Sequence, residues 1–136
     1  MRILEQDARA AMNANAPTRR ISIVDDDESI REALKNLMRS ARLHAEAFAS
    51  AEEFLASERY ADTACLILDV NLPGMSGFEL QSLLKARKRG IPIIFITAQA
   101  DDASRQRALK SGAIECLSKP VRRELLFKAI QSAMHS

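Results

Sequence analysis

Leu66-Ile67-Leu68-Asp69-Val70-Asn71-Leu72-Pro73-Gly74 is the stretch that decides the fold of this chain. Its apolar run ends at a carboxylate, and a Pro-Gly pair turns the backbone shortly afterwards. A run without polar alternation is typical of a strand covered on both faces, as in a parallel sheet between helices. Asp69 would then lie at the carboxyl end of the strand, where open α/β sheets bind ligands. Because an unpaired carboxylate buried there costs several kcal/mol, we expect a cation nearby.

Strand-like and helix-like patterns alternate on both sides of this stretch. Each predicted strand precedes a helical pattern, and the strands cover residues 21–24, 44–49, 64–68, 92–96 and 114–117. The strand at 92–96 runs into Thr97. Five such units predict a five-stranded parallel sheet with helices on both faces, a three-layer α/β/α fold with right-handed crossovers.

The helices are predicted from apolar spacing and from capping residues. Ser50 and Ser76, each followed three residues later by Glu, have the spacing of a capping box. The first of these helices should end near Arg59 and the second at Gly90, with the basic residues 85–89 in its last turn. A mostly polar helix over about 101–111 should be the loosest element. The residues expected to pack in the helices are Ile30, Leu34, Leu37, Met38, Phe54, Leu55, Leu80, Leu83, Leu84, Ala103, Ala108, Leu109, Leu125, Leu126, Ala129, Ile130 and Met134.

Length and composition limit the class of protein. With 136 residues, 47% hydrophobic and 28% charged, the chain fits one globular domain. We expect a tail over residues 1–18 and a single domain over 19–136. The net charge of +2 comes from residues 1–20, so the body is neutral, and with five Phe and one Tyr it offers no basic, aromatic surface for nucleic acid. No signal peptide or membrane span is visible, so no membrane partner and a cytoplasmic location are expected.

Two further patterns exclude common chemistries. Glycines in the spacing G-x-G-x-x-G do not follow the first strand, which disfavours a dinucleotide ligand. Cys65 and Cys116 lie far apart in strand-like runs, so buried, reduced thiols are predicted.

Reactive side chains follow the predicted strands. Asp25-Asp26-Asp27 follows the first strand, Asp69 ends the third, Thr97 ends the fourth and Lys119 follows the fifth. In a parallel sheet these ends lie at one edge. One acid of 25–27 should be only an N-cap, but clustered carboxylates with incomplete protein coordination suit Mg²⁺. Mg²⁺ with Thr97 and Lys119 as donors would receive a phosphoryl group, and Asp69 would be the nucleophile.

Four stretches carry a family resemblance, and each occurs at the position along the chain that the family's pattern requires. Val24–Asp27, Leu68–Gly77, Ile96-Thr97-Ala98 and Ser118-Lys119-Pro120 resemble the CheY-like receiver domain of two-component response regulators, over about residues 20–135. Asp25–Arg31 and Ser50–Leu55 look closest to the FixJ-type branch. The resemblance implies the flavodoxin-like strand order 2-1-3-4-5.

The resemblance also implies roles at the site. Asp69 would take a phosphoryl group from a phosphohistidine on a sensor histidine kinase. Asp26, the Asp69 carboxylate and the Asn71 main-chain carbonyl would bind Mg²⁺, and Asp25 would act through a water molecule. Thr97 and Lys119 would bind phosphoryl oxygens.

Further consequences of the resemblance concern the switch. Asn71 and Gln99 would line the route of the hydrolytic water, and Lys119-Pro120 is a candidate cis peptide. Phosphorylation would rearrange the face of the helix at 101–111, the fifth strand and the last helix, and a downstream effector or output domain, or a homodimer, would read it. No turnover of a separate substrate is expected.

The sequence departs from the family's pattern at Cys116, because family members usually carry Tyr or Phe there.

Two other classes compete with the receiver, which would itself stand alone or belong to a longer FixJ-type DNA-binding regulator. A haloacid-dehalogenase-type phosphatase would use Asp25, since Asp25-x-Asp27-x-Ser29 loosely matches its nucleophile and acid spacing. That class leaves Asp69 unexplained, and the chain has no room for its cap domain. The third class is a receiver-like interaction module without chemistry, which the intact acid cluster disfavours.

Overall fold

The computed structural model describes residues 20–135, so the predicted tail over 1–18 and its boundary lie outside the described residues. Five parallel strands form one sheet in the order β2-β1-β3-β4-β5, which confirms the predicted fold class and strand order. In chain order the elements are β1 (Arg20–Val24), α2 (Glu28–Ser40), β2 (His44–Phe48), α3 (Ala51–Ala56), the 3-10 turn η1 (Arg59–Ala61), β3 (Thr63–Asp69), α4 (Gly77–Ala86), β4 (Ile93–Thr97), α5 (Asp102–Lys110), β5 (Glu115–Ser118) and α6 (Arg123–Met134).

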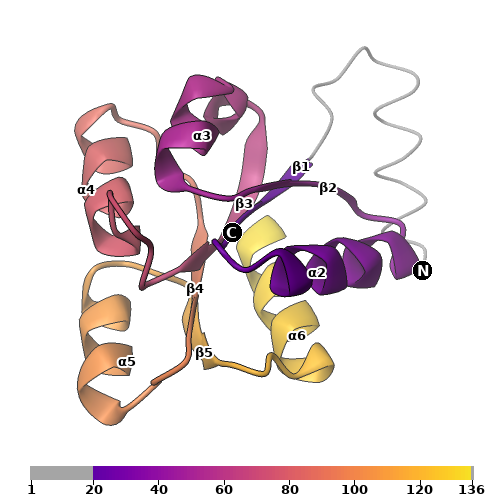
Figure 1. Cartoon of the computed structure of the whole chain (residues 1–136). Coiled ribbons are helices and arrows are strands. Elements are labelled where there is room, and N and C mark those ends of the chain that lie inside the picture. Colours follow the sequence, from indigo (N-terminus) through magenta and orange to yellow (C-terminus); the bar gives the residue numbers. More distant parts are fainter. Residues whose placement is uncertain (1–19, 136) are drawn as a thin grey trace.

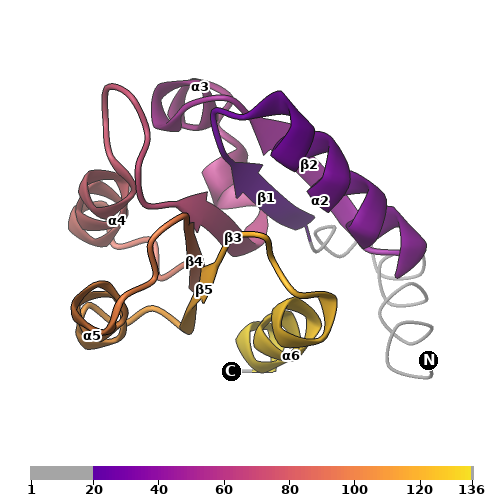
Figure 2. The same cartoon turned by 60° about the horizontal axis from the view of Figure 1, so that its bottom comes forward.

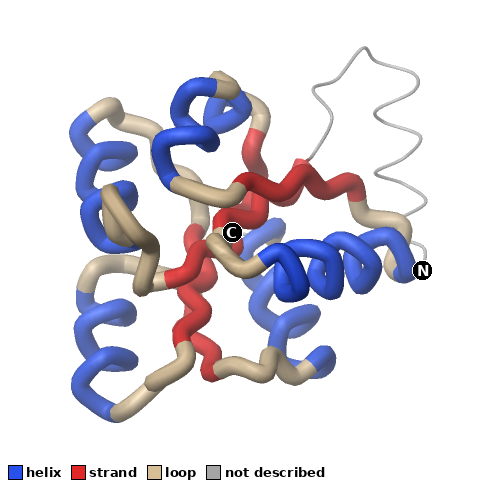
Figure 3. Tube along the Cα trace, in the orientation of Figure 1, coloured by secondary structure: helices blue, strands red, loops and turns tan. Residues whose placement is uncertain are grey.

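Helices cover both faces of the sheet. Helices α2 and α6 lie on one face, and α3, α4 and α5 lie on the other (Figures 1 and 2). The strands form the central layer between them (Figure 3). Each face holds its own apolar core, because alternate residues of a strand point to opposite sides.

Strand β3 is buried on both faces, as its sequence predicts. Cys65 and Ile67 pack into the core beneath α2 and α6, whereas Leu66 and Leu68 pack into the core beneath α3, α4 and α5. All four side chains are fully buried. Asp69 therefore ends a strand that has no exposed face.

Two helices end earlier than predicted. Helix α3 ends at Ala56, because Glu58 adopts a left-handed conformation (φ 59°) and η1 follows. Helix α4 ends at Ala86 rather than at Gly90, because Lys88 (φ 58°) is its left-handed C′ residue. Only Lys85 of the basic cluster thus lies in the last turn of α4.

The same closing motif ends three helices. After α4, the Lys88 N–H donates to Lys85 O and the Arg89 N–H donates to Leu84 O, which is the Schellman pattern. Helices α2 and α5 end in the same way with Arg42 and Gly112 as the left-handed residues. Of these three residues Gly112 is the glycine, and it marks the end that the sequence predicts.

Three predicted packing residues lie on the outside. Leu125 is 44% exposed and Leu109 is 45% exposed, and Ala103 is exposed as well. Neighbouring helical residues point about 100° apart, so the burial of Ala108 and Leu126 turns Leu109 and Leu125 outward. The small Ala133, which the prediction omitted, completes the buried stripe of α6.

Capping occurs as predicted at Ser76 and in a modified form at Ser50. Ser76 and Glu79 form a complete capping box at the start of α4. At α3 the Ser50 hydroxyl accepts the Glu53 N–H, but Glu53 accepts the N–H of Ala49 rather than that of Ser50. No helix in residues 20–135 is long and apolar enough to cross a membrane.

Candidate functional site

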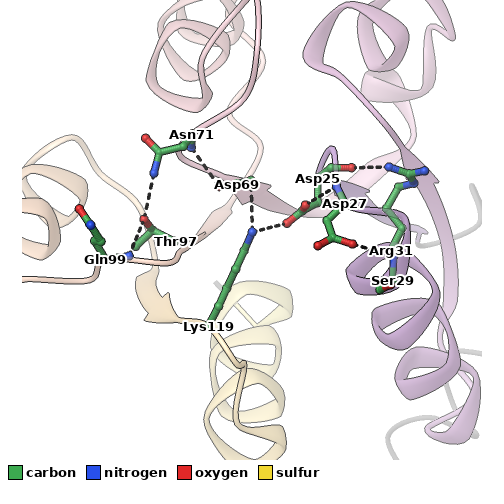
Figure 4. Close-up of polar contacts among 9 residues, drawn as sticks. All are labelled: Asp25, Asp27, Ser29, Arg31, Asp69, Asn71, Thr97, Gln99 and Lys119. Atoms are coloured by element: carbon green, nitrogen blue, oxygen red, sulfur yellow. Dashed lines mark hydrogen bonds and ion pairs between the residues drawn. The ribbon is translucent and has the colours of Figure 1, made fainter.

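The carboxyl ends of four strands meet at one edge of the sheet (Figure 4). Asp25 and Asp26 follow β1, and Asp69 is the last residue of β3. One carboxylate oxygen from each of the three lies within 4.8 Å of the others. Asp25 and Asp69 are buried, whereas Asp26 is exposed. The structure therefore places together the three acids that the sequence assigns to a metal site.

Lys119 supplies the cation that the buried Asp69 requires. Its Nζ lies 2.9 Å from Asp25 Oδ2 and 3.0 Å from Asp69 Oδ2, reaching in from the loop after β5 (Figure 4). The peptide bond between Lys119 and Pro120 is cis, as predicted. Partial burial lowers the pKa of Lys119, but hydrogen bonds to Asp25 and Asp69 outweigh this effect and raise it overall. Lys119 is thus a firmly protonated counterion.

The surroundings of Asp69 raise the pKa of its carboxyl group. Burial raises its pKa above the ordinary value, and the negative charge of Asp25 adds to this effect. Bonds from the Asn71 N–H, 2.9 Å from Asp69 Oδ1, and from Lys119 oppose the rise without cancelling it. A carboxylate with a raised pKa is more basic, and hence a better nucleophile than an exposed aspartate.

Asp27 does not belong to the acid cluster. Its Oδ1 accepts the Ser29 N–H at 2.8 Å, so it is the N-cap of α2, the role expected for one of the three acids. Its own N–H donates to Asp25 Oδ1 at 2.8 Å. Asp27 therefore both starts the helix and holds the Asp25 carboxylate in place.

Thr97, Asn71 and Gln99 gather on the other side of Asp69 (Figure 4). The buried Thr97 accepts contacts from Asn71 Nδ2 at 3.4 Å and from the Gln99 N–H at 3.3 Å. Both are longer than the usual 2.7–3.2 Å and are therefore weak. The Thr97 hydroxyl is accordingly available for a stronger partner at the site.

Two residues that organise the site escaped sequence reasoning. Arg31 donates from Nη1 to the Asp25 carbonyl at 2.8 Å. Glu52 accepts the Met75 N–H at 2.9 Å and so holds the loop between β3 and α4. Both lie in stretches that resemble the family, but each acts on a main-chain group, and sequence patterns carry no signal for such contacts.

Gly77 lets α4 begin directly against the end of β3. A Cβ atom there would overlap the carbonyl oxygen of Asp69 and lie 3.0 Å from Val70 Cα, and both are backbone atoms that cannot turn aside. We expect Gly77→Ala to lower the free energy of unfolding by about 1–3 kcal/mol, measured by urea denaturation. Gly90→Ala is the matched control, because no atom lies within 4 Å of a Cβ at that position. An equal effect of the two variants would contradict the role given to Gly77.

Both cysteines are buried, free thiols, as predicted. Burial raises the pKa of Cys65 to about 12, and burial also raises that of Cys116 against the nearby charge of Arg105. We therefore expect native protein at pH 8 to react slowly with a thiol reagent, Cys65 on the order of 10³-fold more slowly than a free thiol. Denatured protein should react at both positions at once, and rapid labelling of the native protein would contradict the assignment.

Comparison with known proteins agrees with this geometry. The response regulator receiver domain family matches residues 21–131. Nodulation protein W of Bradyrhizobium diazoefficiens is 46% identical over 113 residues, which cover 83% of this chain and 50% of that protein. Transcriptional regulatory protein FixJ of the same organism is 33% identical over 114 residues, covering 84% of this chain and 56% of FixJ.

Solved structures also resemble this chain in fold and sequence. The structure of the response regulator StyR matches with a TM-score of 0.79 at 46% identity, covering 87% of this chain and 60% of that one. The chain spans about half the length of the curated relatives it matches. With its acid cluster, its lysine and its strand order in place, the chain belongs to the response regulator receiver domain family, the CheY-like receivers of two-component systems, and FixJ-type regulators are among its relatives.

Proposed function

We propose that Asp69 is the phosphoacceptor of this receiver domain and that a sensor histidine kinase supplies the phosphoryl group. The observation that carries the proposal is the buried Asp69 carboxylate, which faces Lys119 beside Asp25 and Asp26. In the transfer, an Asp69 oxygen attacks the phosphorus of a phosphohistidine. The new O–P bond forms as the P–N bond breaks, and the electron pair stays on the imidazole nitrogen, which then takes up a proton.

The donor set fits Mg²⁺. Three carboxylates lie together, the Lys119 ammonium group contacts two of them, and the buried Asp25 Oδ2 has Lys119 as its ion-pair partner. Hard oxygen donors with some positions left to water are what Mg²⁺ prefers. Asp26, Asp69 and the Asn71 main-chain carbonyl would hold the ion, and Asp25 would act through a water molecule. When bound, Mg²⁺ would neutralise charge on the phosphoryl oxygens.

The side chains around Asp69 would bind the phosphoryl group and the water that removes it. Lys119 would pair with one phosphoryl oxygen, and the Thr97 hydroxyl would exchange its weak contacts for a bond to another. Asn71 and Gln99 flank Thr97 and are exposed, so they would line the approach of the water that hydrolyses the acyl phosphate. Substitutions there would change the lifetime of the phosphorylated state.

The phosphatase alternative receives no support at Asp25. Its side chain is fully buried, one oxygen accepts the Asp27 N–H and the other faces Lys119. Asp69 is buried and paired in a similar way, but it ends the central strand between Lys119 and Thr97, the two donors that a phosphoryl group would need. Asp25 is better placed to support a metal ion than to attack phosphorus.

The signal would leave through the face formed by α5, β5 and α6. We propose that a downstream effector or output domain reads this face, and that phosphorylation promotes a homodimer through it. Leu109 and Leu125 are the large apolar side chains exposed there. Relatives named as transcriptional regulators, such as FixJ, make a DNA-binding output domain the alternative to a separate effector.

Phosphoryl mapping tests the proposal. The protein is incubated with acetyl phosphate and MgCl₂, and the modified residue is located by mass spectrometry after trapping of the acyl phosphate. We expect modification at Asp69 that depends on Mg²⁺. Turnover that requires Asp25 instead would indicate a phosphatase, and neither modification nor Mg²⁺ binding would leave an interaction module.

A further inference from the structure

We propose that Arg31 is a positioning residue for the metal-binding acids: through the carbonyl of Asp25 it fixes the peptide that orients the carboxylate of Asp26. The inference rests on the proposed function, because it concerns Mg²⁺ binding at the same site. It assigns a role to a residue of α2 that contacts neither the metal ligands' side chains nor the phosphoacceptor.

The contact is a charged hydrogen bond between a helix and the loop that precedes it. Arg31 lies one turn into α2, and its Nη1 donates to the Asp25 carbonyl at 2.8 Å (Figure 4). The side chain is half-buried, so the guanidinium is held rather than free in solvent. Hydrogen bonds from a charged donor are about twice as strong as neutral ones.

Arg31 completes the immobilisation of Asp25. The Asp25 N–H donates to Phe48 O at 3.1 Å, and Asp25 Oδ1 accepts the Asp27 N–H at 2.8 Å. Asp25 Oδ2 faces Lys119 Nζ at 2.9 Å. With the carbonyl bound to Arg31, every polar group of Asp25 has a partner from a different part of the chain.

Asp26 depends on this arrangement. It is exposed, and in the described part of the chain no hydrogen bond or ion pair reaches its carboxylate. The carbonyl of Asp25 and the nitrogen of Asp26 belong to one planar peptide, so holding the carbonyl also fixes the direction in which the Asp26 backbone leaves. The position of the Asp26 Cα, from which its carboxylate must reach the metal ion, is therefore set from the main chain, and Arg31 is the side chain that holds this peptide.

Removing Arg31 should change the affinity for Mg²⁺ in opposite directions, depending on whether this residue acts through its charge or by positioning the peptide. If Arg31 acted only through its charge, removing this cation would strengthen Mg²⁺ binding, because the guanidinium and the metal ion repel each other. If it acts by position, removing it loosens Asp26 and weakens binding. The guanidinium touches a carbonyl rather than a carboxylate and is partly exposed to solvent, so its charge is screened and position should dominate.

Magnesium titration of Arg31→Met measures the effect directly. The full chain is titrated with MgCl₂ and followed by NMR at the backbone amides of Asp26 and Asn71, without any phosphodonor. We expect the dissociation constant for Mg²⁺ to rise about 10-fold, the lower end of the effect of losing an outer-shell partner of a metal ligand. Arg39→Met is the matched control, since Arg39 lies on the same helix and is exposed, and Asn36 is the side-chain partner of its guanidinium within residues 20–135. It should change the constant by less than about two-fold.

Each outcome decides between position, charge and a purely structural role. An unchanged or tighter constant in Arg31→Met overturns the inference, even if the melting temperature falls. Should Arg31→Met fail to fold, Arg31→Lys keeps the charge without the planar fork, and weaker Mg²⁺ binding there supports positioning while an unchanged constant overturns it. Wild-type protein that binds Mg²⁺ but gains no phosphoryl group would contradict the proposed function alone.

Discussion

Asp69→Asn is expected to abolish phosphoryl incorporation from acetyl phosphate while the fold stays intact. The amide oxygen is a far weaker nucleophile than the carboxylate, so the rate of labelling should fall by at least about 10³-fold. The measurement is the time course of acyl phosphate formation, followed by mass spectrometry at saturating Mg²⁺. Retained labelling at the wild-type rate would place the phosphoacceptor elsewhere.

Stability separates the chemical effect of Asp69→Asn from a structural one. Burial and the charge of Asp25 raise the pKa of Asp69, so the ionised carboxylate destabilises the folded state without metal. Its contribution is most favourable below the ordinary aspartate pKa and is lost as the pH rises through the higher folded value. At neutral pH without Mg²⁺, the neutral amide should therefore leave the free energy of unfolding unchanged or higher. A large destabilisation would contradict this account.

Asp27→Asn is the control for the same chemical change nearby. Asp27 caps α2 and lies outside the acid cluster, and asparagine is as good an N-cap as aspartate. Labelling of Asp69 should proceed at close to the wild-type rate in this variant. Loss of labelling in both variants would mean that the effect reflects the loop rather than the nucleophile.

The sequence predicts the sheet and the site because both depend on strands. The uninterrupted apolar run that ends at Asp69 identifies a doubly buried strand, and parallel pairing then brings Asp25, Thr97 and Lys119 to the same edge. Side-chain chemistry at the ends of strands is visible in the residue order, so the acid cluster and its lysine follow from the sequence alone.

Features that depend on the main chain could not be predicted in the same way. The ends of α2 and α4 are closed by left-handed Arg42 and Lys88, residues whose propensity gives no sign of that conformation. Arg31 and Glu52 bind backbone groups, which every residue possesses and no pattern distinguishes. The exposure of Leu109 and Leu125 follows from helix rotation, which packing decides.

Cys116 raises the question of how phosphorylation is transmitted without the usual aromatic residue. It is buried on β5 in register with Phe95 of β4. The ring centres of Phe95 and Phe78 on α4 lie 4.7 Å apart, and the guanidinium of Arg107 on α5 lies 4.0 Å from the centre of the Phe78 ring. Phe95 and Phe78 therefore supply aromatic packing between β4 and α4, and Arg107 connects this pair to α5.

Lys119→Met is expected to have the largest effect on stability. It removes the cation that faces Asp25 and Asp69, whose side chains are 0% and 4% exposed. Breaking a fully buried pair costs about 3–5 kcal/mol, and since Lys119 is 18% exposed we expect about 2–4 kcal/mol at pH 7 without Mg²⁺. Lys35→Met is the control, because its pair with Glu32 on α2 is open to solvent on the Glu32 side and only partly buried at Lys35, so it should contribute less than about 0.5 kcal/mol. Urea denaturation of both variants in EDTA measures the difference.

The pH and Mg²⁺ dependence of Lys119→Met shows whether unpaired charge is the cause. Burial and the charge of Asp25 already raise the pKa of Asp69, and loss of the ammonium group removes what opposes them, so the folded state takes up a proton more readily. Its stability relative to wild type should then recover as the pH falls from 7 toward about 4. Mg²⁺ replaces the missing cation, so saturating MgCl₂ should stabilise the variant more than it stabilises wild type. A deficit that persists under both conditions would instead indicate lost packing of the lysine stem, and the acid cluster would not need its cation.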